Sequence, residues 1–427
     1  MGESIYITGP AKQSFSAPTF SAPEHFTLDN GVEVYAVLSD QTETLKIEWV
    51  FEAGSTVAQK VLQATACADL LNKGTHTKSG FDINEQLDLY GSYFSADSSR
   101  DDITLHLFTL RRFLPQVLPI IADLLKEAAY PENEFDVWLD AKKSIYEVNQ
   151  NKTDFMAATR FPSVIFGKDT PYGFFLKKEH FGQLYVEDAR AHHQCLLESP
   201  FKIFVSGSVP PNWRMLLHDC FCDLRPSENI TKKAFDESVP TDDRLFVEVS
   251  DSVQNSIIVG KRLMVRDVEK YTRFMVMNTM LGGYFGSRLM ANLREKNGFT
   301  YGAGSGLSRM KFSDVYKIST DVGAEVSDNA QREILHEIKV LQTDLAKDDE
   351  LQRVKTYMSG SFLRSFDGPQ AIMDRYKSLV LYGMPMDFFG LYAEGIHHVS
   401  AEDVRTCAQD YLQELKTVVS GKEDTSG

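Results

Sequence analysis

The chain has 427 residues, of which 43% are hydrophobic and 25% charged, and its formal net charge is −15. This composition is typical of a folded globular protein, and the length predicts two or more domains of roughly 200 residues each. The acidic charge leaves no basic surplus to neutralise phosphates, which argues against nucleic acid or an anionic membrane as the main partner.

The beginning of the sequence carries neither the basic segment nor the apolar run of a secretory signal, and no stretch approaches 18 uninterrupted apolar residues. A leader removed before this sequence begins would leave no trace in it. The cysteines are odd in number and lie in apolar patterns, as reduced core residues do: Cys67, Cys195, Cys220, Cys222 and Cys407. The sequence therefore predicts a cytoplasmic protein without a membrane span.

In chain order, a Pro-, Ser- and Ala-rich arm over residues 1–24 precedes a region of strand patterns. The turn residues Asn30 and Gly31 separate two short strands. Periodicity and helix stops then predict strands at 45–51 and 103–110 and helices at 61–71, 83–90, 116–128, 134–151, 156–166 and 185–197. The adjacent His192 and His193 lie within the last of these helices, where we expect one exposed and one half-buried ring rather than a ligand pair.

A strand at 202–207 and a helix at 212–224 complete the first half, and the polar run 225–240 is the predicted linker. The predicted domains are thus 25–224 and 241–427. In the second, strands are expected at 244–249, 256–264, 300–307 and 315–322, and helices at 271–281, 287–296 and from there to the end.

The two halves repeat each other. Val186-Glu-Asp-Ala-Arg190 matches Ala401-Glu-Asp-Val-Arg405, and each match precedes a helix and a Val-Ser-Gly strand end. Asp188 and Asp403 are 215 residues apart, and a period this long indicates a duplicated domain. Strands and helices segregate in each half, which predicts an α+β fold of two mainly antiparallel sheets layered with helices.

The segment Leu293-Arg-Glu-Lys-Asn-Gly-Phe-Thr-Tyr301 places an arginine and a tyrosine on either side of a glycine that ends a helix. We expect Arg294 on the last helical turn, Gly298 at its end, and Tyr301 in the strand that follows. A guanidinium and a phenol on two rigid elements could reach the same peptide carbonyls. By themselves the two residues also fit a surface arginine and a half-buried strand tyrosine.

Several motifs occur in a fixed order: L-D-N-G-V-E-V at 28–34, E-A-G-S at 52–55, N-K-G-T at 72–75, G-G-x-x-x-S-R-L at 282–289 and R-E-K-x-G-x-x-Y at 294–301. With the duplicated halves, they resemble the M16 (insulinase or pitrilysin-like) zinc peptidase family over residues 25–420. The likeness is to the short subunits related to mitochondrial processing peptidase, and it implies the LuxS/metallohydrolase-like M16 fold.

The family's zinc site is an inverted H-x-x-E-H helix before K-G-T, joined by a glutamate from a later helix. In this chain the resemblance places Thr65 and Asp69 at the two histidines and Ala68 at the catalytic glutamate. Glu147 falls close to the third ligand. A substitute metal site at Asp69 and Glu147 would lack imidazole, and Ala68 removes the base, so we expect no metal. Cys67 has no neighbouring base and is expected to be a core thiol.

The second half keeps the family's substrate-binding pair, because Arg294 and Tyr301 match the residues that bind substrate carbonyls. The resemblance therefore implies a non-catalytic, substrate-binding subunit that forms a dimer with an M16 chain whose H-x-x-E-H motif is intact and holds the zinc. Its substrate would be a peptide or unfolded polypeptide. The alternative is an inactive peptide-binding or scaffold protein that forms a homodimer. Gly282, Gly283 and Gly286 are expected in a chamber-facing loop that can act as a hinge.

Overall fold

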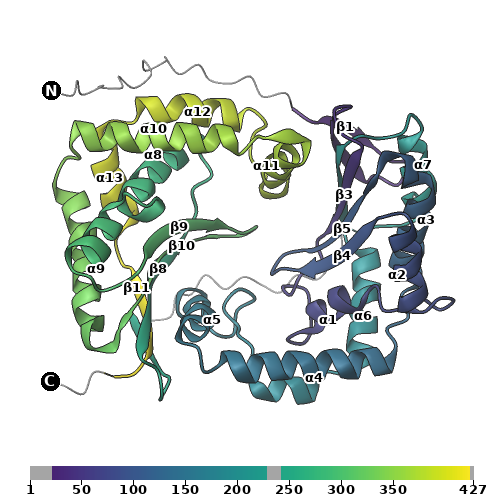
Figure 1. Cartoon of the computed structure of the whole chain (residues 1–427), viewed down its shortest axis with the longest axis horizontal. Helices are drawn as coiled ribbons and strands as arrows, with labels where there is room; N and C mark the ends of the chain where they lie inside the picture. The colour runs from purple at the N-terminus through teal and green to yellow at the C-terminus, as the bar shows by residue number, and fades with distance from the viewer. Residues whose placement is uncertain (1–21, 228–241, 424–427) are drawn as a thin grey trace, which may run out of the picture.

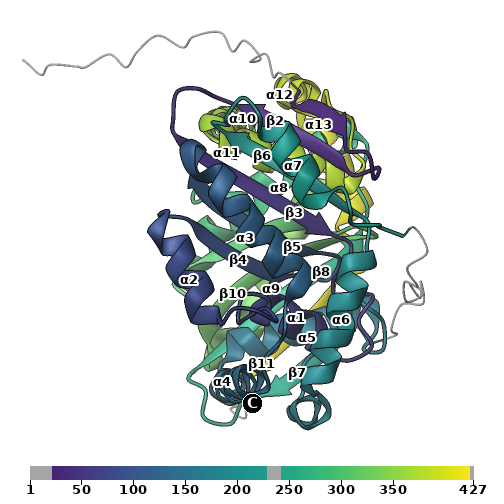
Figure 2. The same ribbon diagram turned by 90° about the vertical axis from the view of Figure 1, so that its right-hand side faces the viewer.

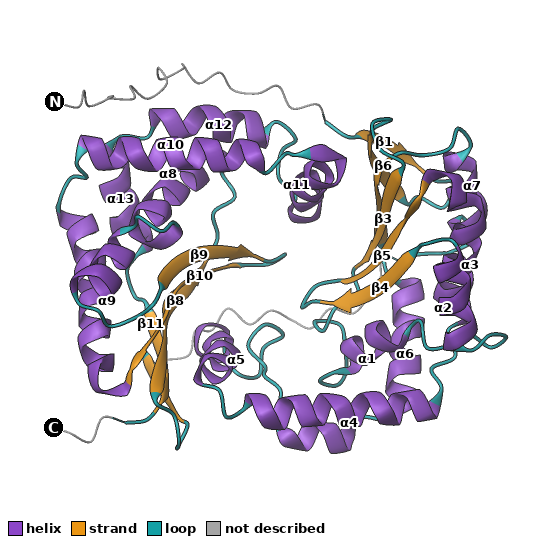
Figure 3. Ribbon diagram, in the orientation of Figure 1, coloured by secondary structure: helices purple, strands orange, loops and turns teal. Residues whose placement is uncertain are grey.

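The computed structural model describes residues 22–227 and 242–423. It contains two sheets that face each other, each backed by helices (Figures 1 and 3). Nearly all of the predicted arm (1–24) and most of the predicted linker (225–240) lie outside the described residues. No helix within the described ranges is long and apolar enough to cross a membrane.

The first half forms a six-stranded sheet in which only the β2–β6 pair is parallel. Its strand order is β1 (Glu24–Thr27), β2 (Glu33–Leu38), β6 (Phe201–Gly207), β3 (Thr44–Phe51), β5 (Ile103–Leu110) and β4 (Tyr93–Ser98). Side chains alternate between the two faces of a strand, so Leu45, Ile47 and Trp49 of β3 all enter the core under the outer helices. Those helices are α1 (Gln63–Leu70), α2 (Gly80–Leu89), α3 (Leu114–Glu127), α6 (Val186–Glu198) and α7 (Trp213–Phe221) (Figure 2).

Short 3₁₀ turns η1 (Arg111–Phe113) and η2 (Lys178–Gln183) connect elements of this half, and α4 (Glu132–Asn149) leads toward the second half.

The second half repeats this topology. The order of its sheet is β7 (Arg244–Glu248), β11 (Lys416–Gly421), β8 (Gln254–Leu263), β10 (Asp314–Gly323) and β9 (Ala303–Arg309), with only β7–β11 parallel. This is the order β2-β6-β3-β5-β4 of the first half. Its helices are α8 (Val268–Asn278), α9 (Ser327–Thr343), α10 (Asp348–Arg364), α12 (Phe388–His398) and α13 (Ala401–Tyr411), with turns η3 (Thr279–Gly283), η4 (Met290–Lys296) and η5 (Ala324–Val326). The predicted duplicated α+β fold is confirmed.

Each half also places one helix on the inner face of the other half's sheet, the face turned toward the centre of the molecule (Figure 1). Helix α5 (Thr153–Phe166) packs on β8, β11 and β7, where Phe161 joins an apolar cluster with Ile258 and Val418. Helix α11 (Gly368–Tyr382) packs on β6 and β2, where Met373 joins Tyr35 and other residues of the first sheet. The exchange ties the two halves together through apolar burial.

Candidate functional site

The helix that would carry the zinc motif, α1, is a small-residue helix built into the core. Ala68 is 2% exposed, and Ala64, Ala66 and Cys67 are buried as well. Thr65 accepts a hydrogen bond from Ser98 Oγ of β4 at 3.0 Å. None of these side chains can supply an imidazole or a general base, so this helix does not fit a catalytic zinc ion.

Asp69, at the end of α1, is bound by two residues of α4. Its Oδ2 accepts a hydrogen bond from Trp138 Nε1 at 2.9 Å and lies 2.8 Å from Lys142 Nζ. The ammonium of Lys142 supplies the positive charge that a metal would bring to this carboxylate. A second cation beside Asp69 would therefore meet electrostatic repulsion.

Glu147 lies further along α4, and its carboxylate forms an ion pair with Lys178 at 3.1 Å. Asp69 and Glu147 are thus each paired with a different lysine. Across residues 22–227 and 242–423, no group of three or more His, Cys, Asp or Glu side chains could hold a metal ion.

Cys67 is a buried core thiol. Its Sγ lies 3.4 Å from Tyr130 Oη, and burial raises the pKa of the thiol to about 12. The group is therefore protonated at neutral pH and is not an activated nucleophile.

The expectation of one exposed ring for the histidine pair of α6 is wrong. His192 and His193 are 2% and 8% exposed, and their Nε2 atoms lie 2.7 Å from the carbonyls of Ala53 and Leu125, respectively. Adjacent residues on a helix point in different directions, so each ring meets a different carbonyl. The two rings satisfy buried backbone groups and are not a ligand pair.

Arg294 lies in η4, which ends where the sequence predicts. Gly298 adopts φ +66°, and the N–H of Phe299 returns to the carbonyl of Leu293 at 2.8 Å. A glycine in the left-handed region is the usual end of a helical segment.

The predicted position of Tyr301 within a strand is wrong, because β9 begins at Ala303. Thr300 closes a local turn: its Oγ1 accepts the N–H of Gly302 at 3.0 Å and donates to the carbonyl of the same residue at 2.9 Å. This turn keeps Tyr301 out of the sheet ladder.

Tyr301 and Arg294 both project from the protein surface. Tyr301 is 91% exposed, and the Arg294 guanidinium lies 4.9 Å from the ring centroid of Phe285, which is itself 65% exposed. In the described part of the chain, neither the phenol of Tyr301 nor the guanidinium of Arg294 forms a hydrogen bond or an ion pair. Both groups are thus free to bind an external acceptor. Phe285 gave no sequence signal beyond its place in the glycine-rich run.

The glycine-rich segment packs closely against β9. A Cβ at Gly282 would lie 2.8 Å from the backbone nitrogen of Ser305, and the Ser305 hydroxyl donates to Asn278 Oδ1 at 2.7 Å. A Cβ at Gly286 would lie 2.8 Å from the ring of Tyr284. Close approach therefore requires glycine at 282. The hinge role of Gly282, Gly283 and Gly286 stays a prediction.

Comparison with protein families gives two matches along the chain. The profile of Insulinase (Peptidase family M16) matches residues 34–164, and that of the Peptidase M16 inactive domain matches residues 189–358. An uncharacterized zinc protease of Rickettsia felis is 21% identical, over 94% of this chain and 98% of that protein.

Solved structures share the fold. The peptidase M16 inactive domain from Pseudomonas fluorescens superposes with a TM-score of 0.84 at 18% identity, over 93% of this chain and 97% of that one. The periplasmic protease PqqL from Escherichia coli superposes with a TM-score of 0.77 at 17% identity, over 97% of this chain but 47% of that one. The chain belongs to the M16 (insulinase) peptidase family, as a member that lacks the H-x-x-E-H zinc motif.

Proposed function

We propose that this protein is the non-catalytic, substrate-binding subunit of a two-subunit M16 zinc endopeptidase that cuts peptides or unfolded segments. One observation carries the proposal: the positions of the zinc motif are filled by Thr65, Ala68 and a lysine-paired Asp69, whereas Arg294 and Tyr301 are exposed and unpartnered. The chain has lost its metal chemistry and kept two hydrogen-bond donors.

The proposed role of the pair follows from their chemistry. A guanidinium and a phenol both donate hydrogen bonds to carbonyl oxygens, and such bonds strengthen as an oxygen gains negative charge. Zinc and the general base would come from a partner with an intact H-x-x-E-H motif. Arg294 and Tyr301 would hold the substrate backbone opposite that metal and stabilise the developing oxyanion.

The length of PqqL supports a paired arrangement. The present chain covers 47% of it, so that protein has room for about two units of this size in one polypeptide. In the proposed peptidase, two separate chains would supply the two units and enclose a shared chamber. The predicted cytoplasmic location belongs to the same proposal, and fractionation of cells with an antibody to the native protein tests it.

Purified alone, the protein should contain no stoichiometric zinc and cut no peptide. Co-purification should recover an M16 subunit with H-x-x-E-H, and the mixture should be active. Arg294→Ala or Tyr301→Phe should then lower kcat/KM about 10²- to 10³-fold.

Arg112→Ala is the matched control, because the Arg112 guanidinium also stacks on a ring, 4.7 Å from the centroid of Phe113, but in the other half. Full activity of both the Arg294 and Tyr301 variants would overturn the assigned role. A homodimer that retains peptide without an H-x-x-E-H partner would instead indicate the peptide-binding scaffold.

A further inference from the structure

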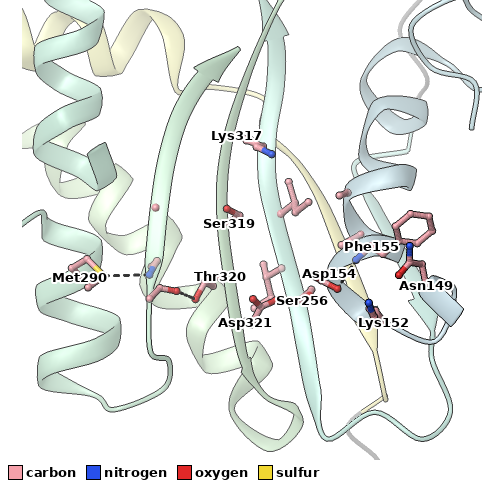
Figure 4. A pocket seen from close by; sticks show the side chains of 17 residues that line it. Asn149, Lys152, Asp154, Phe155, Ser256, Met290, Lys317, Ser319, Thr320 and Asp321 are labelled. Atoms are coloured by element: carbon pink, nitrogen blue, oxygen red, sulfur yellow. Dashed lines mark hydrogen bonds between the residues drawn. The ribbon is translucent and has the colours of Figure 1, made fainter. Parts of the chain in front are cut away.

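A pocket of about 650 Å³ opens on the inner face of the second sheet, between β8, β9 and β10 and the beginning of α5 (Figure 4). This volume lies in the range of sites that bury a small molecule or a few residues of a peptide. Its polar lining residues are Asn149, Lys152, Asp154, Lys317, Ser319 and Asp321.

Small residues on the strands open this pocket. Gly304 and Gly306 of β9 pair with Ser319 and Lys317 of β10, and a Cβ at Gly306 would meet nothing within 4 Å. The equivalent strands of the first half, β4 and β5, carry the rings of Tyr93, His106 and Phe108 on their inner face. The duplicated fold therefore leaves space in the second half where side chains fill it in the first.

The acceptors of the pocket already have partners. Asp154 Oδ1 accepts the N–H of Phe155 at 2.8 Å, and Asp321 Oδ1 accepts the hydroxyl of Ser256. Its donors do not: within the described ranges, the side chains of Lys152, Lys317, Asn149 and Ser319 form no hydrogen bond or ion pair. In Figure 4 the two lysines lie on different walls, Lys317 on β10 and Lys152 before α5.

We infer that this pocket binds an acidic side chain of an extended peptide. Two unpaired ammonium groups favour a carboxylate, and the glycines of β9 allow a peptide backbone to approach closely. The inference rests on the proposed function, because the pocket adjoins its binding pair: Gly302 follows Tyr301, and Met290 lies one helical turn before Arg294. Met290 also accepts the N–H of Ala303 at its sulfur, 3.3 Å away, which joins η4 to β9.

Binding of two probe peptides by the full-length chain tests the inference. Both are nine-residue, acetylated and amidated Gly/Ala peptides with a neutral fluorophore; one contains three glutamates and the other three glutamines. Fluorescence anisotropy should show about three- to tenfold tighter binding of the glutamate peptide, as expected for two partly exposed ion pairs. The double variant K152A/K317A should bind both peptides equally, with the affinity for the glutamine peptide unchanged.

Lys143→Ala, an exposed lysine of α4 that does not line the pocket, should keep the preference. Equal affinity of the two peptides for the natural protein, or a preference that survives in K152A/K317A, would overturn the inference. Arg294→Ala separates the two levels: if it weakens both peptides and no preference exists, only the acidic pocket is wrong. If neither peptide binds the natural protein, the pocket and the proposed peptide binding both fail.

Discussion

The Nζ atom of Lys142 lies 2.8 Å from the carboxylate of Asp69, on the pair of helices where zinc-binding members of the family hold their metal. Trp138 donates to the same oxygen from one turn earlier on α4. The degenerate position is therefore a closed polar contact, with its charge balanced and its donors satisfied. This arrangement explains how the chain keeps the fold of a zinc peptidase without the ion.

Substitutions at Asp69 should measure this contact. Asp69→Ala leaves the Trp138 indole N–H and the Lys142 ammonium without their acceptor, and it should lower the free energy of unfolding by about 1–2 kcal/mol. Asp69→Asn keeps an acceptor for Trp138 and should cost less. Urea unfolding of both variants checks the order. Glu147→Ala, which removes an exposed pair with Lys178, is the control and should change stability little. Equal stability of Asp69→Ala and the natural protein would contradict a stabilising role.

The duplication was predictable because its sequence signal has a local physical cause. Asp188 accepts the N–H of Tyr185 and Asp403 accepts the N–H of Ser400, each at 2.8 Å, so the repeated Glu-Asp motif begins equivalent helices, α6 and α13. The stop of η4 at Gly298 was predictable for a similar reason, since its φ of +66° suits glycine.

The exchange of α5 and α11 was not predictable, because an amphipathic pattern shows that a helix buries one face but not which sheet it covers. The place of Tyr301 depended on a side-chain turn at Thr300, which competes with strand pairing and leaves no periodic signal. The pairing of Asp69 with Lys142 likewise depends on tertiary contact between α1 and α4.

The exchanged helices predict that the two halves unfold together. Phe161 of α5 is 2% exposed and Met373 of α11 is 1% exposed, and each packs against the sheet of the other half. Phe161→Ala should cost about 3–5 kcal/mol and Met373→Ala about 2–5 kcal/mol. Calorimetry should still show a single transition at a lower Tm. Val137→Ala, on an exposed face of α4, is the control. Separate transitions of the two halves in either core variant would contradict the coupling.

A charged cluster under α11 should make stability depend on pH. Glu48 of β3 is 1% exposed and contacts His106 Nδ1 at 3.0 Å and Lys377 Nζ at 2.7 Å. Burial alone would raise the pKa of Glu48, but the hydrogen bond from His106 and the nearby lysines outweigh it and lower this pKa to about 2. Hydrogen bonds to Asp97 and Glu48 raise the pKa of His106 to about 9.

The sign of the effect follows from these directions. Because the folded pKa of His106 is raised, its contribution is complete below about pH 6.5 and is lost as the pH rises through about 9. Glu48 contributes above about pH 4.5 and loses this contribution as the pH falls toward 2. His106→Gln should therefore be less stable than the natural protein by about 1–3 kcal/mol at pH 6 and nearly equal to it at pH 10. Urea unfolding at both values checks this. A difference that is the same at both would exclude His106 as the titrating group.

Phe285 should position Arg294 for substrate. The exposed ring holds the guanidinium at 4.9 Å, and an exposed cation–π contact contributes about 0.5–1 kcal/mol. Phe285→Ala should therefore weaken binding of an unfolded peptide about two- to fivefold, and Phe285→Tyr, which keeps the ring, should restore it. The same change in an Arg294→Ala background should have no further effect, because the ring then has no guanidinium to hold. Phe81→Ala, at another exposed phenylalanine, is the control. An equal loss from Phe285→Ala with and without Arg294 would show that the ring contacts the peptide independently of the arginine.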